Sequence, residues 1–257
     1  MFNSHYNFFE KHGYVLINLF SKKEILFFRN QIINKINKKI LDKSKKVYNL
    51  KNFHHIKLDD KQDSSIFNSN DRFILLSKKI LKKIFNNKLI NKIMINSWGH
   101  THHVVKWVGN LEKNEIKNYV TGFRVVRPEK KFKRQIVAGA HIDMHVGGKI
   151  CFDKNVLLTL WTPILGVSSK YTLSLAPGTH NINHPLNMYE KNKKIVSNIF
   201  LSSYAKKFKF IRPNLKYGQV ILFHPNLLHG GSFNKGIYTR ASLEIRMYNK
   251  RNIKFWN

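Results

Sequence analysis

A histidine and an aspartate separated by one residue form the most distinctive polar pair in the sequence. His141 and Asp143 lie in the segment AHIDMHV, which is expected to be a strand. Alternate residues of a strand project to the same face, so the two side chains are expected to converge. A histidine from a distant strand would complete a two-histidine, one-carboxylate set, which suits non-haem iron(II). His229, in LLHGG, is the candidate for this third ligand.

Three ligands on one face of an octahedral metal leave three positions open. A keto acid could chelate two of them and leave the third for dioxygen, and its far carboxylate would then need a buried cation. Arg240 lies 11 residues after His229 on the expected next strand, and its planar fork matches a carboxylate. Ser242 lies on the same face of that strand and could donate a hydroxyl hydrogen bond to the same group.

Several further motifs make the pattern specific. The segments that carry it are HIDMH, LSLAPGTH, LLHGGSFNKGIYTRAS, the strand LWTPI and the opening FFEKHGYVLINLFSKKEI. Together they resemble the non-haem iron(II), 2-oxoglutarate-dependent oxygenases and are most similar to the phytanoyl-CoA dioxygenase-like superfamily. The resemblance covers the ends and the core strands of the chain.

The resemblance implies a role for each matching residue. It assigns iron(II), 2-oxoglutarate as cosubstrate and dioxygen, with succinate and carbon dioxide as by-products. The iron ligands would be His141, Asp143 and His229; the cosubstrate residues would be Arg240, Ser242 and Trp161. The reaction expected is hydroxylation of a small or medium, anionic organic substrate that is sugar-linked, lipid-linked or an acyl-CoA.

Two positions bear on how far the resemblance extends. Halogenating relatives replace the aspartate with a small residue, so Asp143 favours hydroxylation or a related oxidation. The family often has a serine two residues after the distal histidine. This chain has Gly231 there and Ser232 one position further, so that contact is not carried over.

Three alternatives stay open at this point. His145 could contact substrate near the metal, act as a third ligand or be a hydrogen-bonded wall residue. Arg240 and Arg246 form an R-x5-R pattern that also resembles the AlkB-like nucleic-acid demethylases, although the PGTH segment is foreign to them. A non-catalytic barrel that binds a polyanion is the alternative outside enzymes, whereas Arg240 argues against a cupin-like isomerase.

The composition is strongly basic. Lysine and arginine number 46 against 14 acidic residues, giving a formal charge of +32. This charge suits an anionic small molecule, nucleic acid or an anionic membrane surface, and the alternative is a solvated, lysine-rich surface because the lysines are spread along the chain. The single cysteine excludes an intramolecular disulfide, and the absence of a signal peptide or a long apolar run favours a cytoplasmic protein without a transmembrane segment.

The hydrophobic pattern predicts one domain over residues 1–257, mainly β with flanking helices. The short strands predict a β-sandwich or a jelly roll. The resemblance implies that this core is a double-stranded β-helix, that is, a jelly-roll or cupin-like barrel. The N-terminal helical part covers about 1–95 and includes a helix over 22–41 capped by Ser21, a loop over 42–70 and a helix capped by Asp71. The β core covers about 119–250, and the insertion at about 185–210 is expected to be helical.

Overall fold

The computed structural model describes residues 2–40, 49–51, 73–99, 103–108, 116–118, 120–128, 138–143, 145–146, 151–152, 156–185, 189–192 and 195–249. The described helices are α1 (Phe2–His12), α2 (Lys22–Ile40), α4 (Lys78–Phe85), α5 (Lys88–Trp98), α6 (Ser202–Ala205) and the 3-10 turn η4 (Thr179–Asn181). The described strands are β1 (Tyr14–Asn18), β2 (Phe73–Leu75), β3 (His103–Val108), β4 (Ile116–Asn118), β5 (Val120–Val126), β6 (Ala138–His141), β7 (His145–Val146), β8 (Cys151–Phe152), β9 (Val156–Leu165), β10 (Ser174–Leu175), β11 (Tyr189–Asn192), β12 (Ile195–Phe200), β13 (Gln219–Phe223), β14 (His229–Gly231) and β15 (Arg240–Asn249).

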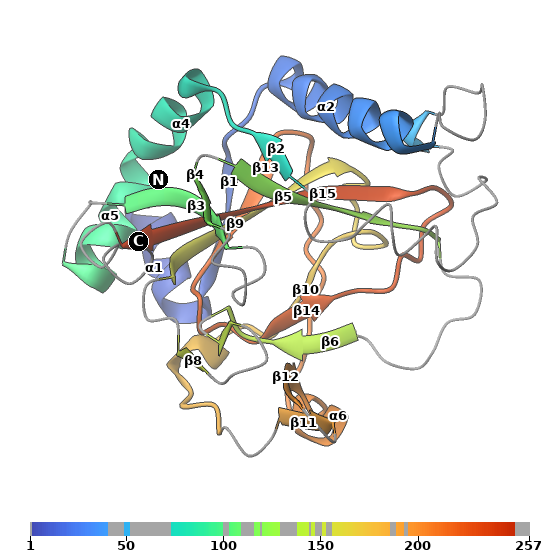
Figure 1. The fold of residues 1–257 in the computed structure, drawn as a ribbon. Coiled ribbons are helices and arrows are strands. Elements are labelled where there is room, and N and C mark those ends of the chain that lie inside the picture. The colour runs from blue at the N-terminus through green and yellow to red at the C-terminus, as the bar shows by residue number, and fades with distance from the viewer. Residues whose placement is uncertain are drawn as a thin grey trace.

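The strands form two facing antiparallel layers (Figure 1). The large sheet runs in the order β1-β13-β9-β15-β3-β4, with β5 also paired to β15 and β2 paired to β5. The small sheet runs β10-β14-β6 and lies across from the large one. This arrangement confirms the predicted jelly-roll core with flanking helices.

Strand alternation gives the large sheet two different faces. Leu243, Ile245 and Met247 of β15 are fully buried in an apolar core that they share with α2, α4 and α5. Arg240 and Arg246 occupy the alternate positions, which face the small sheet together with Ser242 and Glu244. The prediction that these polar residues share one face is therefore confirmed, and the helices cover the other face.

The helix α2 forms as predicted. Glu24 N–H donates to Ser21 Oγ at 3.3 Å, and Ser21 N–H donates to Glu24 Oε2 at 2.7 Å, which is a complete capping box. The periodic residues Ile25, Phe28, Ile32 and Ile36 are buried against the sheet. The predicted loop at 42–70 lies outside the described residues except for 49–51.

The second helix begins later than predicted. Phe73–Leu75 is not helical but forms the strand β2, which pairs with β5, and Leu75 is 66% exposed. Ser77 caps the helix instead, because its Oγ accepts from Ile80 N–H at 3.3 Å. The run Phe-Ile-Leu favours a strand once a partner strand is available, and this tertiary pairing overrides the helical spacing.

The prediction of a helical insertion at 185–210 is wrong. Residues Tyr189–Asn192 and Ile195–Phe200 form an antiparallel hairpin, β11 and β12, and only the short α6 follows it. The strand β12 lies beside β6, and Phe200 is buried with Tyr204 against Ala140 and Ile142. The segment IVSNIF is rich in β-branched residues, which favour a strand over a helix.

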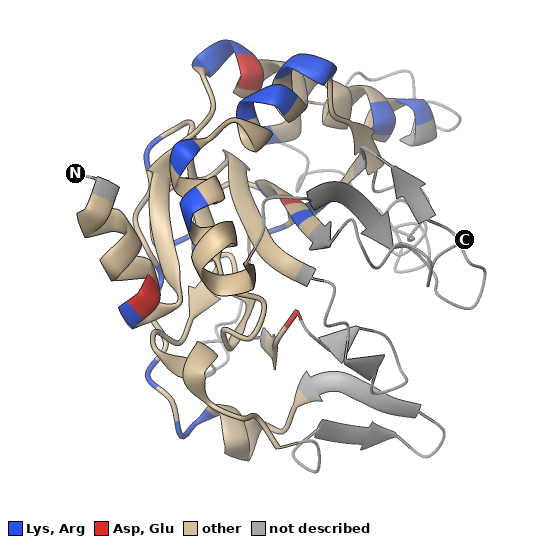
Figure 2. Cartoon of the chain, turned by 90° about the vertical axis from the view of Figure 1, so that its left-hand side faces the viewer, with Lys and Arg blue, Asp and Glu red and all other residues tan. Residues whose placement is uncertain are grey.

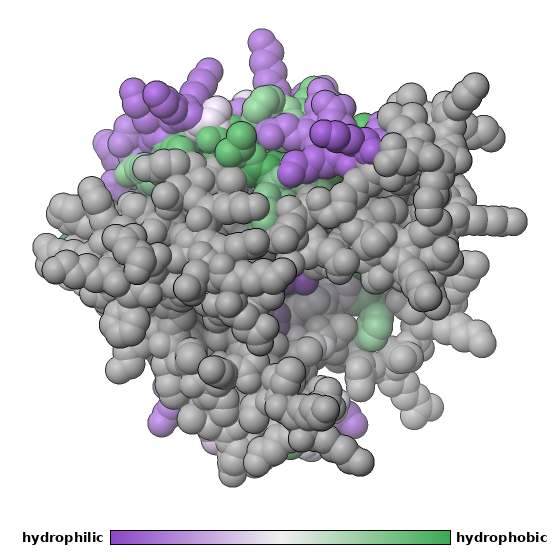
Figure 3. All heavy atoms as spheres, viewed as in Figure 1, coloured by the Kyte–Doolittle hydropathy of each residue, from purple (hydrophilic) through white to green (hydrophobic). Residues whose placement is uncertain are grey.

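The basic residues of the described surface gather on the helices. The exposed lysines on α2 and α4 are Lys22, Lys23, Lys35, Lys38, Lys78, Lys79, Lys82 and Lys83, and lysine and arginine recur along the helical face (Figure 2). In the upper part of Figure 3, hydrophilic residues lie on the outside with apolar residues between them. Among the described helices, none combines the length and apolar character needed to cross a bilayer.

The opening segment packs closely against the C-terminal half of the chain at Gly13. This glycine has φ +74° between α1 and β1, and a Cβ there would lie 2.5 Å from His180 Nδ1. Gly13→Ala is expected to lower the free energy of unfolding by more than about 1–2 kcal/mol, because left-handed strain alone costs that much. Chemical denaturation measures this effect, and Gly99→Ala, where a Cβ meets nothing within 4 Å, serves as the matched control. An equal loss in both variants would show that the close approach to His180 contributes nothing.

Candidate metal centre

The small sheet brings two histidines of the predicted triad face to face. His141 ends β6 and His229 begins β14, and the two are direct partners in the antiparallel pairing. Their ring centroids lie 4.3 Å apart. Residues separated by almost ninety positions in the sequence thus become neighbours because the register of one strand pair places them opposite each other.

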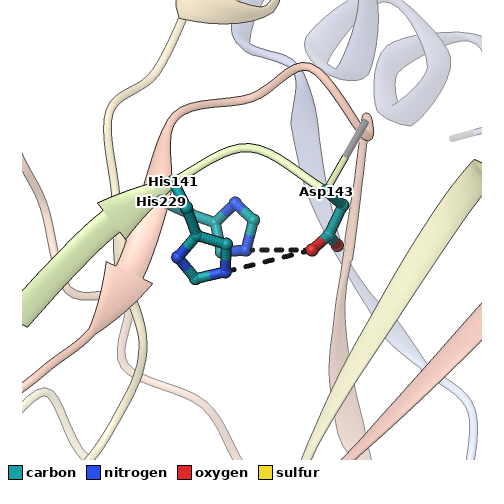
Figure 4. Close-up of side chains that lie close together, drawn as sticks. All are labelled: His141, Asp143 and His229. Atoms are coloured by element: carbon teal, nitrogen blue, oxygen red, sulfur yellow. Dashed lines mark ion pairs between the residues drawn. The ribbon is translucent and has the colours of Figure 1, made fainter. Parts of the chain in front are cut away.

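Backbone carbonyls orient both imidazoles. His141 Nδ1 lies 2.8 Å from the Gly139 carbonyl, and His229 Nδ1 lies 2.8 Å from the Leu227 carbonyl. Each Nδ1 must therefore carry the proton, which leaves the Nε2 lone pair free. Both Nε2 atoms point at Asp143 Oδ1, at 4.0 Å from His141 and 3.6 Å from His229 (Figure 4).

Asp143 reaches the site from a turn rather than from a strand. The strand β6 ends at His141, and Asp143 N–H donates to the Pro225 carbonyl at 2.8 Å. The expected continuous strand through 145 is thus wrong, although the convergence that it predicted is found. The three ligand atoms lie within 4.8 Å of one another, so these residues could hold one metal ion.

The large sheet supplies the partners of the Asp143 carboxylate. Thr159 Oγ1 on β9 donates to Oδ2 at 2.6 Å, and Arg246 Nη2 on β15 donates to Oδ1 at 2.6 Å. The Asp143 side chain is fully buried, and both donors come from adjacent strands. The sequence alone left the role of Arg246 open and did not indicate Thr159. The one feature that could have pointed to Thr159 is its position two residues before Trp161, on the inward face of β9.

The protonation states suit a cation. Burial, together with the neighbouring His229, lowers the pKa of His141 to about 4. Burial raises the pKa of Asp143, but Arg246 and the two histidines outweigh it and bring the value to about 2. At neutral pH the site therefore presents a neutral imidazole and an ionised carboxylate, which are the forms that bind a divalent metal.

Arg240 forms a second, separate polar feature. Its side chain is only 5% exposed, and Nη1 donates to the Tyr171 carbonyl at 2.8 Å and to the Ser232 carbonyl and Oγ at 3.1 Å. All these acceptors are neutral, and Nε is buried with no partner in the described part of the chain. Burial, together with the nearby Arg212 and Arg124, lowers the pKa of Arg240 to about 9, so the group still carries its charge at neutral pH. A buried cation of this kind needs an anion to compensate it.

The remaining predicted cosubstrate residues lie on the correct face of the sheet. Ser242 is 2% exposed, and Trp161 is buried in an apolar cluster with Leu173 and Phe223 between the sheets. Their contact with a cosubstrate stays a prediction. The serine beside Arg240 is Ser232, whose Oγ also donates to the Thr172 carbonyl.

Arg212 was not predicted at all. Its Nε donates to the Thr172 carbonyl at 3.2 Å, next to the Tyr171 carbonyl that holds Arg240. No motif in the sequence marks this residue, because it lies in a segment without regular structure. The side chain of His145 lies outside the description, so its role remains open.

The segment APGTH fixes the strand that carries His229. Thr179 Oγ1 accepts from Leu228 N–H at 2.9 Å, and Ala176 N–H donates to the Leu228 carbonyl at 2.9 Å. His180 Nε2 lies 3.1 Å from the Glu10 carbonyl, so the same turn also contacts α1. This turn therefore locks the residue that precedes a metal ligand.

Buried histidines outside the triad make stability depend on pH. Burial and the neighbouring His180 lower the pKa of His224 to about 3, while its ring stacks on Trp98 at 5.5 Å. Since the unfolded chain binds a proton near the ordinary pKa of about 6.5 and the folded chain does not, stability falls as pH falls below that value. Between pH 7.5 and 5.5 His224 alone is expected to cost about 1.4 kcal/mol.

His224→Gln should remove this part of the pH dependence. Urea unfolding at the two pH values measures it, and the slope of stability against pH should be shallower in the variant than in the wild type. Identical slopes would show that His224 is protonated in the folded protein.

The comparisons with known proteins agree with this geometry at the level of fold. No family model and no curated protein matches the chain. Among solved structures, EctD from S. alaskensis with 2-oxoglutarate and 5-hydroxyectoine is similar with TM-score 0.54 and 15% identity, covering 97% of this chain and 76% of that one. The non-heme alpha ketoglutarate dependent carbocyclase SnoK from nogalamycin biosynthesis is similar with TM-score 0.53 and 14% identity, covering 96% of this chain and 83% of that one. The epimerase SnoN in complex with Fe3+, alpha ketoglutarate and nogalamycin RO is similar with TM-score 0.52 and 13% identity, covering 99% of this chain and 88% of that one. The fold predicted from the resemblance is thereby confirmed.

Proposed function

We propose that this chain is an iron(II)- and 2-oxoglutarate-dependent dioxygenase that hydroxylates a small or medium, anionic organic substrate. The observation that carries the proposal is the convergence of the His141 and His229 Nε2 atoms on Asp143 Oδ1 inside a jelly roll. The donor set of two imidazoles and one carboxylate fits iron(II). Bound iron would supply, together with 2-oxoglutarate and dioxygen, the oxidising chemistry.

The protein residues would bind and orient the reactants. His141, Asp143 and His229 would hold the metal through one atom each. Arg240 would pair with the distal carboxylate of 2-oxoglutarate, which would give its unpartnered Nε an acceptor. Ser242 and Trp161 would complete the cosubstrate pocket, and Ser232 keeps the guanidinium of Arg240 in place.

The proposed substrate class is based on the positive charges near the candidate site. Arg124 is half exposed on β5, and Arg212 lies near the buried Arg240, so the inner face carries several cations. An anionic substrate that is sugar-linked, lipid-linked or an acyl-CoA would suit them. The solved neighbours include a carbocyclase and an epimerase, so hydroxylation is the narrower part of the proposal; it is supported by the carboxylate at Asp143. We further propose that residues 1–257 form one oxygenase domain and that the protein is located in the cytoplasm.

The test is an anaerobic titration of iron(II)-loaded protein with 2-oxoglutarate. A weak metal-to-ligand charge-transfer band in the visible is expected, because a chelating keto acid on iron(II) produces it. Its absence from folded, iron-replete protein would refute the assignment.

One observation keeps the AlkB-like alternative in view. The contact between Arg246 and Asp143 uses the second arginine of the R-x5-R pattern, which resembles that family. If methylated single-stranded oligonucleotides stimulate 2-oxoglutarate turnover and anionic metabolites do not, the nucleic-acid reading replaces the proposed one. A non-catalytic polyanion binder would instead show salt-dependent nucleic-acid or lipid affinity without any need for iron.

A further inference from the structure

A row of alternating charges leads from the protein surface to one ligand of the candidate metal centre. Arg124 Nε lies 3.6 Å from Glu244 Oε2, and Arg246 Nη2 lies 2.6 Å from Glu244 Oε1. The same Arg246 Nη2 lies 2.6 Å from Asp143 Oδ1, the oxygen that faces both histidines. The side chains of Glu244 and Arg246 are only 12% and 15% exposed, so these two members of the row are shielded from solvent.

The sheet holds this row rigidly. Arg246 and Thr159 are direct partners in the pairing of β15 with β9, and they donate to the two different oxygens of Asp143. Glu244 is anchored through its backbone carbonyl, which accepts from Thr121 Oγ1 at 2.6 Å. Both oxygens of the carboxylate are therefore positioned by the large sheet, while the two histidines come from the small sheet.

The charge balance explains why Glu244 is needed. A lone guanidinium beside Asp143 would repel a divalent metal and compete with it for Oδ1. The carboxylate of Glu244, whose Oε1 lies 2.6 Å from Arg246 Nη2, offsets that charge as an ion-pair partner. Arg246 can then hold the orientation of Asp143 without making the centre more positive.

We propose that Glu244 and Arg246 form a neutral clamp that orients the Asp143 carboxylate for metal binding, with Thr159 fixing its second oxygen. The clamp rests on the proposed function, because it assigns positioning residues to that same metal centre. Its members are positioning residues rather than ligands, since they act on the metal only through Asp143. Partners of this kind commonly control ligand orientation and metal affinity.

The test measures cobalt(II) affinity and the visible spectrum of the cobalt(II)-loaded protein, without cosubstrate or turnover. The variant Arg246→Gln/Glu244→Gln removes one positive and one negative charge, so its net charge is unchanged. Its cobalt affinity is expected to fall about 10–100-fold, and its spectrum should change because a freed carboxylate alters the coordination. The matched control is Glu24→Gln/Lys83→Gln, which removes an ion pair of 2.7 Å between α4 and the start of α2, and should keep wild-type affinity.

Two single variants keep the clamp testable if the double variant fails to fold. Glu244→Gln removes the carboxylate that offsets the charge of Arg246 and should weaken cobalt binding relative to the wild type. Thr159→Val frees only Oδ2 and should change the spectrum with a smaller loss of affinity.

The outcomes separate the clamp from the proposed function. If wild-type protein binds no cobalt(II), the proposed metal centre and the proposed clamp are both refuted. If the wild type binds it, and folded variants of Glu244 and Arg246 bind equally with the same spectrum, only the clamp is refuted.

Discussion

Asp143→Ala is expected to abolish both iron binding and the 2-oxoglutarate charge-transfer band. Loss of a residue that merely supports a ligand weakens metal binding about 10–100-fold, so loss of the ligand itself should exceed about 100-fold. The substitution also removes the only carboxylate of the triad and leaves Arg246 beside two imidazoles. Anaerobic iron titration followed by 2-oxoglutarate addition measures both effects.

The control for this prediction is Glu24→Ala, which removes a carboxylate from the start of α2 and leaves the metal centre untouched. It should retain the band at full intensity. A band of wild-type strength in folded Asp143→Ala would refute Asp143 as a required ligand of the metal.

Arg240→Met is expected to weaken 2-oxoglutarate binding at least about 30-fold. Removing one partner of a buried, hydrogen-bonded charge pair costs about 2–5 kcal/mol, which gives that factor at its lower limit. Arg240→Lys keeps the charge but loses the planar fork, so an intermediate loss of about tenfold is expected for one charged hydrogen bond. Anaerobic calorimetric titration of the iron-loaded variants measures the affinities.

Pyruvate provides the chemical control, because it is a keto acid without a distal carboxylate. Wild type and Arg240→Met should bind pyruvate with similar affinity, since pyruvate offers no distal carboxylate to pair with Arg240 in the wild type. If Arg240→Met weakens both keto acids equally, the residue supports the metal centre and does not recognise the carboxylate.

The chemistry-bearing residues were predictable because their types are constrained. A facial triad requires two imidazoles and a carboxylate, and a keto acid requires a buried cation, so few positions in the sequence qualify. His141 and His229 are found opposite each other, and Arg240 is buried with no carboxylate partner among the residues that the structure describes. The period of two along β15 also placed its polar residues on one face correctly.

The partners of those residues could not be predicted, because they depend on strand register. Thr159 meets Asp143 only because β9 pairs with β15 in one particular alignment, and nothing in LLTLW marks it. Arg212 lies near Arg240 because a loop returns to the Tyr171–Thr172 backbone. The hairpin of β11 and β12 was mistaken for a helix because its stability comes from contact with β6, which local spacing does not reveal.

The pairing of β1 with β13 has a consequence for the synthesis of the protein. Tyr14 pairs with Phe223, so β1 has no partner on that edge until more than 200 further residues have left the ribosome. At about 5–20 residues per second this takes on the order of 10–40 s. During that interval the apolar strand YVLIN is an unpaired edge, and folding that depends on so distant a contact is slow. The nascent chain therefore depends on its N-terminal helices, or on a chaperone, to cover this strand until its partner arrives.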